Sequence, residues 1–332
     1  MKKSAVIFLV VLVSIIAFIN QQESQKKTVL LNVAYDVIRD FYKAYNADFR
    51  QAHPDVLISQ SHGGASKQAL SVASGLPADV VTLTQANDID MLVKKGLVAE
   101  NWQQALPNHA TPFGSVMVFL VKKGNPKQIR DWMDLVRDDV KVIFANPKTS
   151  ANGRFAYLSA WAYAQQFQNT QQTHAFMQKL LGNVPVLEAG ARAATISFTQ
   201  RQLGDVLIAP ENEAALAAQA LGEGSFSVVY PSLTAYTPVF VAETRHTKEN
   251  DTQQISQAYL QGLWSEQAQE LAARHYFRPT NEKTLSKFTA LFPPVNSFDV
   301  NEKFGDWATI NQTHFVDNAL FDQLYIKAQG IK

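Results

Sequence analysis

The stretch ISQSHGGASKQAL, from Ile58 to Leu70, shows what kind of fold the chain has. Its β-branched, apolar start is typical of a buried strand, and its KQAL end is typical of a helix. Gly63 and Gly64 separate the two patterns, which indicates a tight turn where another group comes close to the backbone. The stretch therefore predicts a strand–turn–helix unit with a binding loop at the carboxyl end of its strand.

The same strand-then-helix pattern recurs on both sides of this stretch. Strands are predicted at Thr28–Asp36, Asp55–Ser61, Ala78–Thr84, Val140–Pro147 and Asp205–Pro210. A helix pattern follows each of them, which is typical of a largely parallel sheet covered by helices on both faces. Two longer strands, Ser115–Gly124 and Thr234–Thr244, interrupt the alternation. The sequence thus predicts an α/β protein of two lobes, 28–116 with 238–332 and 117–237, joined by hinge strands.

Composition excludes several classes of protein. The 332 residues include 30 basic and 29 acidic side chains, and the chain has no long basic run, which argues against a nucleic-acid partner. It contains no cysteine, so it forms no disulfide, cysteine metal site or lipid-modified cysteine. Its seven histidines include no His-x-x-x-His pair, so we predict neither a zinc site nor another cofactor.

The N-terminus has the pattern of an export signal. Lys2 and Lys3 precede the apolar run Ala5–Ile19, which is shorter than the roughly 17–25 residues needed to span a bilayer. We therefore predict residues 1–27 to be a signal peptide and the body to be periplasmic. Because the residues before Asn20 form a poor cleavage site, an uncleaved inner-membrane anchor is the alternative.

Four loops at the ends of predicted strands are rich in small or hydroxyl residues, and each opens a helix. They are AYDV (Ala34–Val37), SHGGAS (Ser61–Ser66), PKTSANGR (Pro147–Arg154) and EAGARAAT (Glu188–Thr195). Each lobe supplies two of them, so a cleft between the lobes would collect all four. Helix N-termini present free N–H groups, and such dipoles hold a small anion without a counter-charge.

Other kinds of site fit the residues less well. The Gly-Lys dipeptide of a nucleotide phosphate loop is absent, and so is the Gly-x-Ser-x-Gly turn of a serine hydrolase. A hydrolase using His62 with Ser66, or Asp36 as a base, is the enzyme alternative. Because no orienting carboxylate lies near His62 and Ser66 in the sequence, we expect His62 to pack or cap beside the turn and predict no enzyme.

Several motifs also resemble those of one known family. They are LLNVAYD, QSHGGASKQA, NPKTSANGRFAYLSAWAYA, GDVLIAPENEA and HYFRP. From about Thr28 to the C-terminus the chain resembles the periplasmic sulfate- and thiosulfate-binding proteins, the solute receptors of ABC importers. The resemblance implies a two-lobed periplasmic-binding-protein fold of type II, a sulfur oxyanion as ligand, a membrane ABC permease as partner and a monomeric state.

The resemblance also implies which residues bind the ligand. Backbone donors would be Asp36, Ala65, Ala151, Asn152 and Ala191, with Arg192 beside the site. The chain departs from the family where Ala65, followed by Ser66, replaces a serine donor, where Pro210 replaces a tryptophan donor, and where Ala151 and Asn152 replace two glycines. Losing two donors to a charged ligand costs about 3–6 kcal/mol.

The departures leave two questions open. The candidate replacement donors are the side chains of Ser66, Asn152, Thr149 and His62. If these do not restore sulfate binding, the alternatives are the same scaffold with another small ligand, such as an organosulfur anion, or a sensing role.

Overall fold

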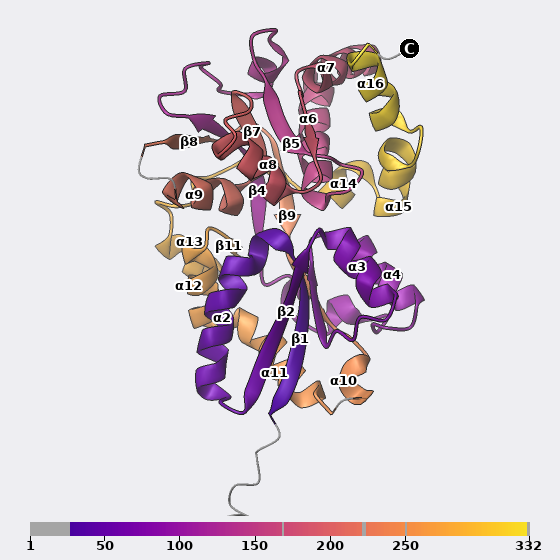
Figure 1. Cartoon of the computed structure of the whole chain (residues 1–332), viewed down its shortest axis with the longest axis vertical. Helices are drawn as coiled ribbons and strands as arrows, with labels where there is room; N and C mark the ends of the chain where they lie inside the picture. The colour runs from indigo at the N-terminus through magenta and orange to yellow at the C-terminus, as the bar shows by residue number, and fades with distance from the viewer. Residues whose placement is uncertain (1–26, 168, 221–223, 250, 331–332) are drawn as a thin grey trace, which may run out of the picture.

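The computed structural model describes residues 27–330 except residues 168, 221–223 and 250. The predicted N-terminal signal therefore lies, except for Lys27, outside the described residues. The described chain forms two lobes, one above the other in Figure 1. None of its described helices is long and apolar enough to cross a membrane.

The first lobe is built on a sheet with the strand order β10-β3-β1-β2. These strands are β1 (Thr28–Tyr35), β2 (Val56–Gly63), β3 (Val80–Leu83) and β10 (Phe240–Glu243). β1 runs parallel to β2 and β3, whereas β10 is antiparallel to β3. The longer helices are α2 (Arg39–Ala52), α3 (Ala65–Ala73), α4 (Ala86–Lys94), α11 (Gln253–Gln261) and α12 (Glu266–Arg274). The shorter ones are η1 (Asp36–Ile38), η2 (Trp102–Gln104), α5 (Pro107–Ala110), α10 (His246–Glu249), η4 (Gly262–Trp264) and α13 (Glu282–Lys287).

The second lobe is built on a mixed sheet with the order β12-β9-β4-β7-β5-β6, and β8 and β11 also pair with β4. These strands are β4 (Phe113–Lys122), β5 (Val142–Ala145), β6 (Leu187–Glu188), β7 (Val206–Pro210), β8 (Phe226–Val229), β9 (Thr234–Pro238), β11 (Arg278–Pro279) and β12 (Ser297–Phe298). β5 is parallel to both β6 and β7, as the alternating pattern predicted. The helices are η3 (Trp132–Val136), α6 (Ala151–Phe167), α7 (Thr170–Gly182), α8 (Ala191–Thr199), α9 (Glu211–Ala220), α14 (Val300–Phe304), α15 (Trp307–Ile310), η5 (Asn311–Phe315) and α16 (Leu320–Ala328).

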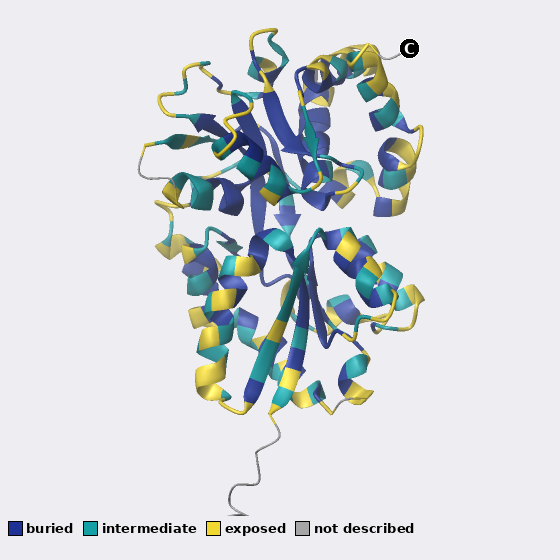
Figure 2. Cartoon of the chain, in the orientation of Figure 1, coloured by how far each residue is buried: buried dark blue, intermediate teal, exposed yellow. Residues whose placement is uncertain are grey.

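Each lobe has its own apolar core, and Figure 2 shows the central strands buried while the outer faces of the helices are exposed. One strand contributes to both cores, because Phe113 at the start of β4 packs in the first lobe and Met117 and Phe119 pack in the second. β9 pairs with β4, and Val239 just beyond it belongs to the first core. The strand expected at Ser115–Gly124 therefore runs between the lobes, whereas the one expected at Thr234–Thr244 is divided into β9 in the second sheet and β10 in the first.

The end of the chain packs on a different lobe from the one that the sequence predicted. The expected lobe boundary placed 238–332 in the first lobe, yet Trp307, Phe315 and Leu324 belong to the second core, and α16 packs against α7. The chain therefore crosses between the lobes a third time, before β12. An amphipathic helix needs an apolar surface, but its sequence does not say which lobe offers one, and here α6 and α7 provide it.

A buried ion pair joins the start of α9 in the second lobe to β11, the short strand that follows α12 of the first lobe. The Arg278 guanidinium in β11 donates to both carboxylate oxygens of Glu211, at 2.6 and 2.8 Å, and the Tyr230 hydroxyl donates to the same carboxylate at 2.7 Å. Only 1% of the Glu211 side chain is exposed. Removing one partner of such a pair costs about 3–5 kcal/mol, so the pair fixes the start of α9 beside the crossing strands.

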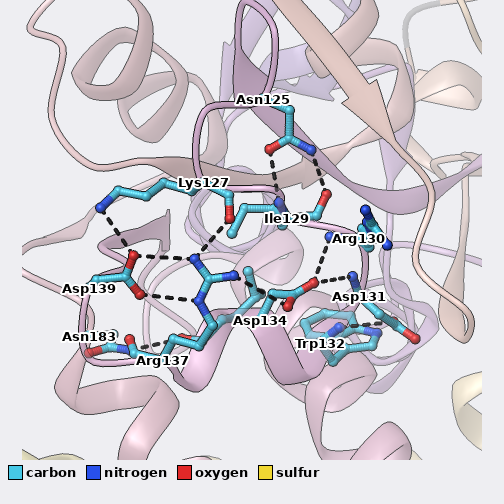
Figure 3. A network of polar contacts seen from close by, with 11 residues as sticks. Asn125, Lys127, Ile129, Arg130, Asp131, Trp132, Asp134, Arg137, Asp139 and Asn183 are labelled. Carbon is cyan, nitrogen blue, oxygen red and sulfur yellow. Dashed lines mark hydrogen bonds and ion pairs between the residues drawn. The ribbon is translucent and has the colours of Figure 1, made fainter.

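The segment 125–139 of the second lobe is held by polar contacts to its own backbone (Figure 3). The Asn125 amide pairs with both the N–H and the carbonyl of Ile129, at 2.9 and 2.8 Å. Asp131 and Asp134 form a capping box at the start of η3. These contacts satisfy backbone groups that the segment would otherwise leave to water, while Ile129, Trp132 and Leu135 pack in the second core.

We expect the start of α6 to tolerate only glycine at residue 153. A Cβ on Gly153 would overlap the carbonyl oxygen of Ala145 at the end of β5, so Gly153→Ala should destabilise the fold by about 1–3 kcal/mol as α6 moves away from the sheet. Gly182→Ala, at the end of α7, is the matched control, because its Cβ would lie 3.6 Å from the nearest atom. Urea unfolding of both variants measures the difference, and an equal effect at the two sites would contradict this packing.

Candidate functional site

The loops predicted to bind a ligand face each other between the lobes. β1 and β2 run toward the second lobe in Figure 1, so their carboxyl ends lie at the lobe interface. A Cβ placed on Gly64 would lie 3.6 Å from the carbonyl oxygen of Thr149 in the second lobe. A Cβ on Gly190 would lie 3.4 Å from a carboxylate oxygen of Asp36 in the first. The four loops are therefore brought together, with the lobes in contact.

The helices that start at this interface lack side-chain caps. α3 begins at Ala65, two residues before the helix that the KQAL pattern indicated, and Gly64 precedes it. α8 begins at Ala191 after Gly190, and η1 begins after Tyr35. The residue before each of these three starts provides no side-chain cap, although at η1 the Asp36 carboxylate interacts with the N–H groups of Asp36 and Val37. The first N–H groups of a helix have no partner within the helix, so an acceptor has to come from outside it.

The start of α6 is capped only in part. The Ser150 hydroxyl accepts a hydrogen bond from the Gly153 N–H at 3.3 Å, and the Arg154 N–H donates to the Ser150 carbonyl at 3.1 Å. The N–H groups of Ala151 and Asn152 are therefore the ones that intrahelical geometry leaves without a partner. Both residues are buried, at 4% and 6% exposure.

The predicted backbone donors all lie at such helix starts. Ala65, Ala151 and Ala191 are each the first residue of a helix and each is buried, and Asp36 is the first residue of η1. Their N–H groups come from both lobes and lie at the facing edges of the two sheets. That they contact a ligand stays a prediction.

Three of the four candidate replacement side chains already contact other residues, and Ser66 and His62 are two of them. The Ser66 hydroxyl donates to the Asp88 carboxylate at 3.1 Å. Nδ1 of His62 lies 3.4 Å from the Tyr35 carbonyl oxygen, and burial lowers the pKa of this imidazole. His62 thus packs beside the turn, as expected, and Ser66 points to α4.

The two remaining candidates, Thr149 and Asn152, differ from each other. The Thr149 hydroxyl donates to the Ala189 carbonyl at 3.0 Å. Within the described residues, the Asn152 side chain makes no hydrogen bond, so it is the candidate whose amide is left for a ligand. Pro210 is buried at the end of β7, where it pairs with Met117, and its own side chain provides no donor before α9.

The charges at the site balance one another. Nη1 of Arg192 donates to both carboxylate oxygens of Glu213 at 3.2 Å. Burial raises the pKa of the Glu213 carboxyl, and the Arg192 charge opposes that shift. Burial also raises the pKa of Asp36, against the effect of its own N–H and that of Val37. Arg192 therefore has no surplus charge to offer, and an anion would rely on the N–H dipoles.

A further polar contact crosses the lobe interface. Nη1 of Arg154 in α6 donates to Oε1 of Gln85, which precedes α4, at 3.2 Å, and Nε of Arg154 donates to the Pro147 carbonyl at 2.9 Å. Burial raises the pKa of Asp88 in α4 to about 6, although the charge of Arg154 and the hydrogen bond from Ser66 oppose the shift.

Sequence reasoning missed Gln85 and Asp88. Their segment, TQAND, contains no glycine and no unusual composition. It does follow β3, which runs parallel to β1. Because the carboxyl ends of parallel strands meet at one edge of a sheet, this rule applied to the third strand would have found both residues.

Asp88 should make the stability of the protein depend on pH. Its pKa in the folded state, about 6, is above the usual aspartate value of 3.8, so its stabilising contribution is complete below about pH 4 and is lost as the pH rises through about 6. Asp88→Asn mimics the protonated acid and keeps an acceptor for Ser66. We expect this variant to match the wild type near pH 4 and to exceed its free energy of unfolding by up to about 3 kcal/mol at pH 7.

Urea unfolding at pH 4, 5, 6 and 7 tests this expectation. Asp55→Asn, which removes an exposed carboxyl from the same lobe, is the matched control. A difference between Asp88→Asn and the wild type that stays constant over this range would contradict the assignment.

Comparison with known proteins identifies a family and several relatives to which this chain is similar. Residues 30–278 match the family of bacterial extracellular solute-binding proteins. The thiosulfate-binding protein of Pseudomonas aeruginosa is 49% identical over 305 residues, which cover 89% of this chain and 92% of that protein. The sulfate-binding protein of Escherichia coli is 43% identical over 303 residues, which cover 89% of this chain and 92% of that protein.

Solved structures agree with these relatives. The sulfate-binding protein SubI from Mycobacterium tuberculosis is 31% identical, with a TM-score of 0.78 over 87% of this chain and 100% of that one. A periplasmic thiamin binding protein, 18% identical, has the same fold, with a TM-score of 0.67 over 91% of this chain and 95% of that one. The predicted two-lobed fold is confirmed. The chain belongs to the bacterial extracellular solute-binding proteins, in the family of the sulfate- and thiosulfate-binding relatives.

Proposed function

We propose that this protein is an exported receptor that binds sulfate or thiosulfate between its lobes and delivers it to an ABC importer. The observation that carries the proposal is the set of helix starts at the lobe interface. α3 and α8 begin there after glycines with no side-chain cap, and α6 begins there with two free N–H groups. The sulfate- and thiosulfate-binding names of the relatives support the choice of ligand.

The proposed contacts are mainly backbone groups. The N–H groups of Asp36, Ala65, Ser66, Ala151, Asn152 and Ala191 would donate to the oxyanion. A hydrogen bond to a charged group contributes about 1.5–3 kcal/mol, and a Kd of about 1 μM needs about 8 kcal/mol, so these donors suffice without the missing side chains. Arg192, already paired with Glu213, would stabilise the start of α8 rather than bind the anion directly.

The candidate ligands are sulfate, thiosulfate and a larger organosulfur anion. Pro210 stands where the resemblance implies a tryptophan, so the wall of the cleft beside α9 is smaller. This observation favours thiosulfate over sulfate, because the sulfur that replaces one oxygen is larger. An organosulfur anion on the same scaffold is the second candidate, and the same observation supports it.

A receptor fits the site better than an enzyme does. Ser66 donates to Asp88, and His62 lies against the Tyr35 carbonyl, so the two residues contact different partners and do not form a nucleophile–base pair. Nucleophilic catalysis requires these groups within hydrogen-bond reach of each other. The proposed protein binds its ligand and releases it unchanged.

The proposed partner is the membrane permease of the importer. β4 and β9 run between the lobes, so a small rotation about them would open and close the interface. The permease would recognise the closed form. We place the receptor in the periplasm, a location that the match to an extracellular family supports. We further propose that it is a monomer with no nucleic-acid partner.

Titration calorimetry on the purified protein, freed of ligand by unfolding and refolding, tests the proposed function. The ligands are sulfate, thiosulfate, phosphate, molybdate and taurine. We expect a Kd at or below about 1 μM for thiosulfate or sulfate and at least 100-fold weaker binding of phosphate. Heat from taurine alone would instead support the organosulfur candidate, and no response to any of the five would overturn the proposal.

Proline at the first residue of a helix removes one donor while keeping the helix. Proline is well tolerated there, and Gly64 and Gly190 already have the extended backbone that a following proline needs. We expect Ala65→Pro and Ala191→Pro to weaken binding about 10- to 150-fold, the effect of one hydrogen bond to a charged ligand.

Thr170→Pro is the matched control for these variants. Thr170 is exposed at the first residue of α7, and Asn169 before it is also extended. Thr170→Pro should bind as the wild type does. Wild-type affinity in both Ala65→Pro and Ala191→Pro would show that the helix starts do not hold the ligand.

A further inference from the structure

Gln85 lies where three helix starts meet. It directly precedes α4, and its Oε1 accepts a hydrogen bond from Arg154 in the first turn of α6, in the other lobe. One turn further along α4, Asp88 accepts a hydrogen bond from Ser66, the second residue of α3. Gln85 is thus beside the loops of the proposed anion site, although neither motif resemblance nor loop composition pointed to it.

The amide of Gln85 is half satisfied. The residue is completely buried, and Nε2 has no hydrogen-bond partner within the described part of the chain. Because Arg154 carries only donors, it can pair with Oε1 and not with Nε2. The contact with Arg154 therefore fixes the orientation of the Gln85 amide, with Oε1 toward Arg154. The two N–H bonds of Nε2 are left without an acceptor.

Because Nε2 has no partner among the described residues, closure of the lobes is favourable only when a ligand supplies an acceptor for it. When the lobes separate, water can reach both Gln85 and Arg154. When they close without a ligand, Nε2 is buried unpaired, which is unfavourable. When they close around an anion, an oxygen of that anion can accept from Nε2, and the unfavourable term is removed.

Resting on the function proposed above, we propose that Gln85 is a ligand-contacting selectivity residue. Arg154 of the second lobe holds its Oε1, and its Nε2 donates to the oxyanion bound between the lobes. In this way the loop after β3 supplies a side-chain donor in a chain where Ala65 and Pro210 provide none. The contact favours a fully ionised oxyanion, which has only acceptors, over an anion that presents a proton at this point.

A purely structural role for Gln85 would predict the opposite response to one substitution. Gln85→Glu keeps an oxygen for Arg154 and adds a negative charge, so it strengthens the contact between the lobes. If Gln85 only joined the lobes, this variant would bind the anion as tightly as the wild type or more tightly. If Nε2 donates to the anion, the variant replaces a donor by a like charge, and affinity should fall at least 100-fold.

Two further variants complete the comparison. Gln85→Leu removes the donor without adding charge, and we expect it to bind about 10- to 100-fold more weakly than the wild type. Gln104→Glu makes the same charge change at an exposed residue of the first lobe, and we expect its affinity to stay within twofold of the wild type. Calorimetry with sulfate and thiosulfate measures all four proteins.

A measurement on the wild type keeps the test independent of whether a variant folds. The side-chain amide resonances of Gln85 are identified in a ¹H–¹⁵N spectrum by their loss in Gln85→Leu, or by selective labelling if that variant is unfolded. On addition of thiosulfate or sulfate we expect this amide pair to shift and to be protected from exchange with water.

The outcomes separate the two proposals. If the wild type binds neither anion, the proposed function fails and the role of Gln85 fails with it. If the wild type binds but Gln85→Glu binds equally well or better, only the role of Gln85 is overturned. An amide pair that neither shifts nor gains protection when the ligand binds would overturn it as well.

Discussion

Backbone N–H groups without partners set the conditions under which the two lobes can meet. The starts of α3, α6 and α8 face one another, and the glycines before α3 and α8 offer no cap. Buried and dry, such groups are costly, whereas in an open cleft water satisfies them. Because the donors come from both lobes, one small acceptor between them satisfies both sides. Ligand binding and lobe closure are then two descriptions of one equilibrium.

The balance of charge at the site follows from this reliance on dipoles. Glu213 neutralises Arg192, so the site does not attract every anion by net charge. Discrimination then depends on how many acceptors a ligand offers and where it offers them. Asp88 accepts the hydrogen bond of the Ser66 hydroxyl, whereas the amide of Asn152 has no hydrogen-bond partner among the described residues, so the side-chain donors differ from those that the resemblance implied.

The features that sequence reasoning predicted are local ones. Strand–helix alternation is encoded in neighbouring residues, and the Gly63–Gly64 pair marked a tight turn that the structure contains, so the sheets and loops could be foreseen. The direction of the Ser66 side chain could not be foreseen, because its rotamer depends on a hydrogen bond to Asp88, 22 residues away. The lobe on which 300–324 packs could not either, since its apolar residues would fit any apolar surface.

Each lobe is completed by segments that come late in the chain. The first core includes Phe277, and the second includes Leu324. A nascent chain still on the ribosome therefore leaves the apolar faces of α6 and α7 uncovered until α16 has been synthesised. For the exported receptor proposed above this order is an advantage, because a chain that cannot yet fold stays extended enough to pass through a narrow translocation channel.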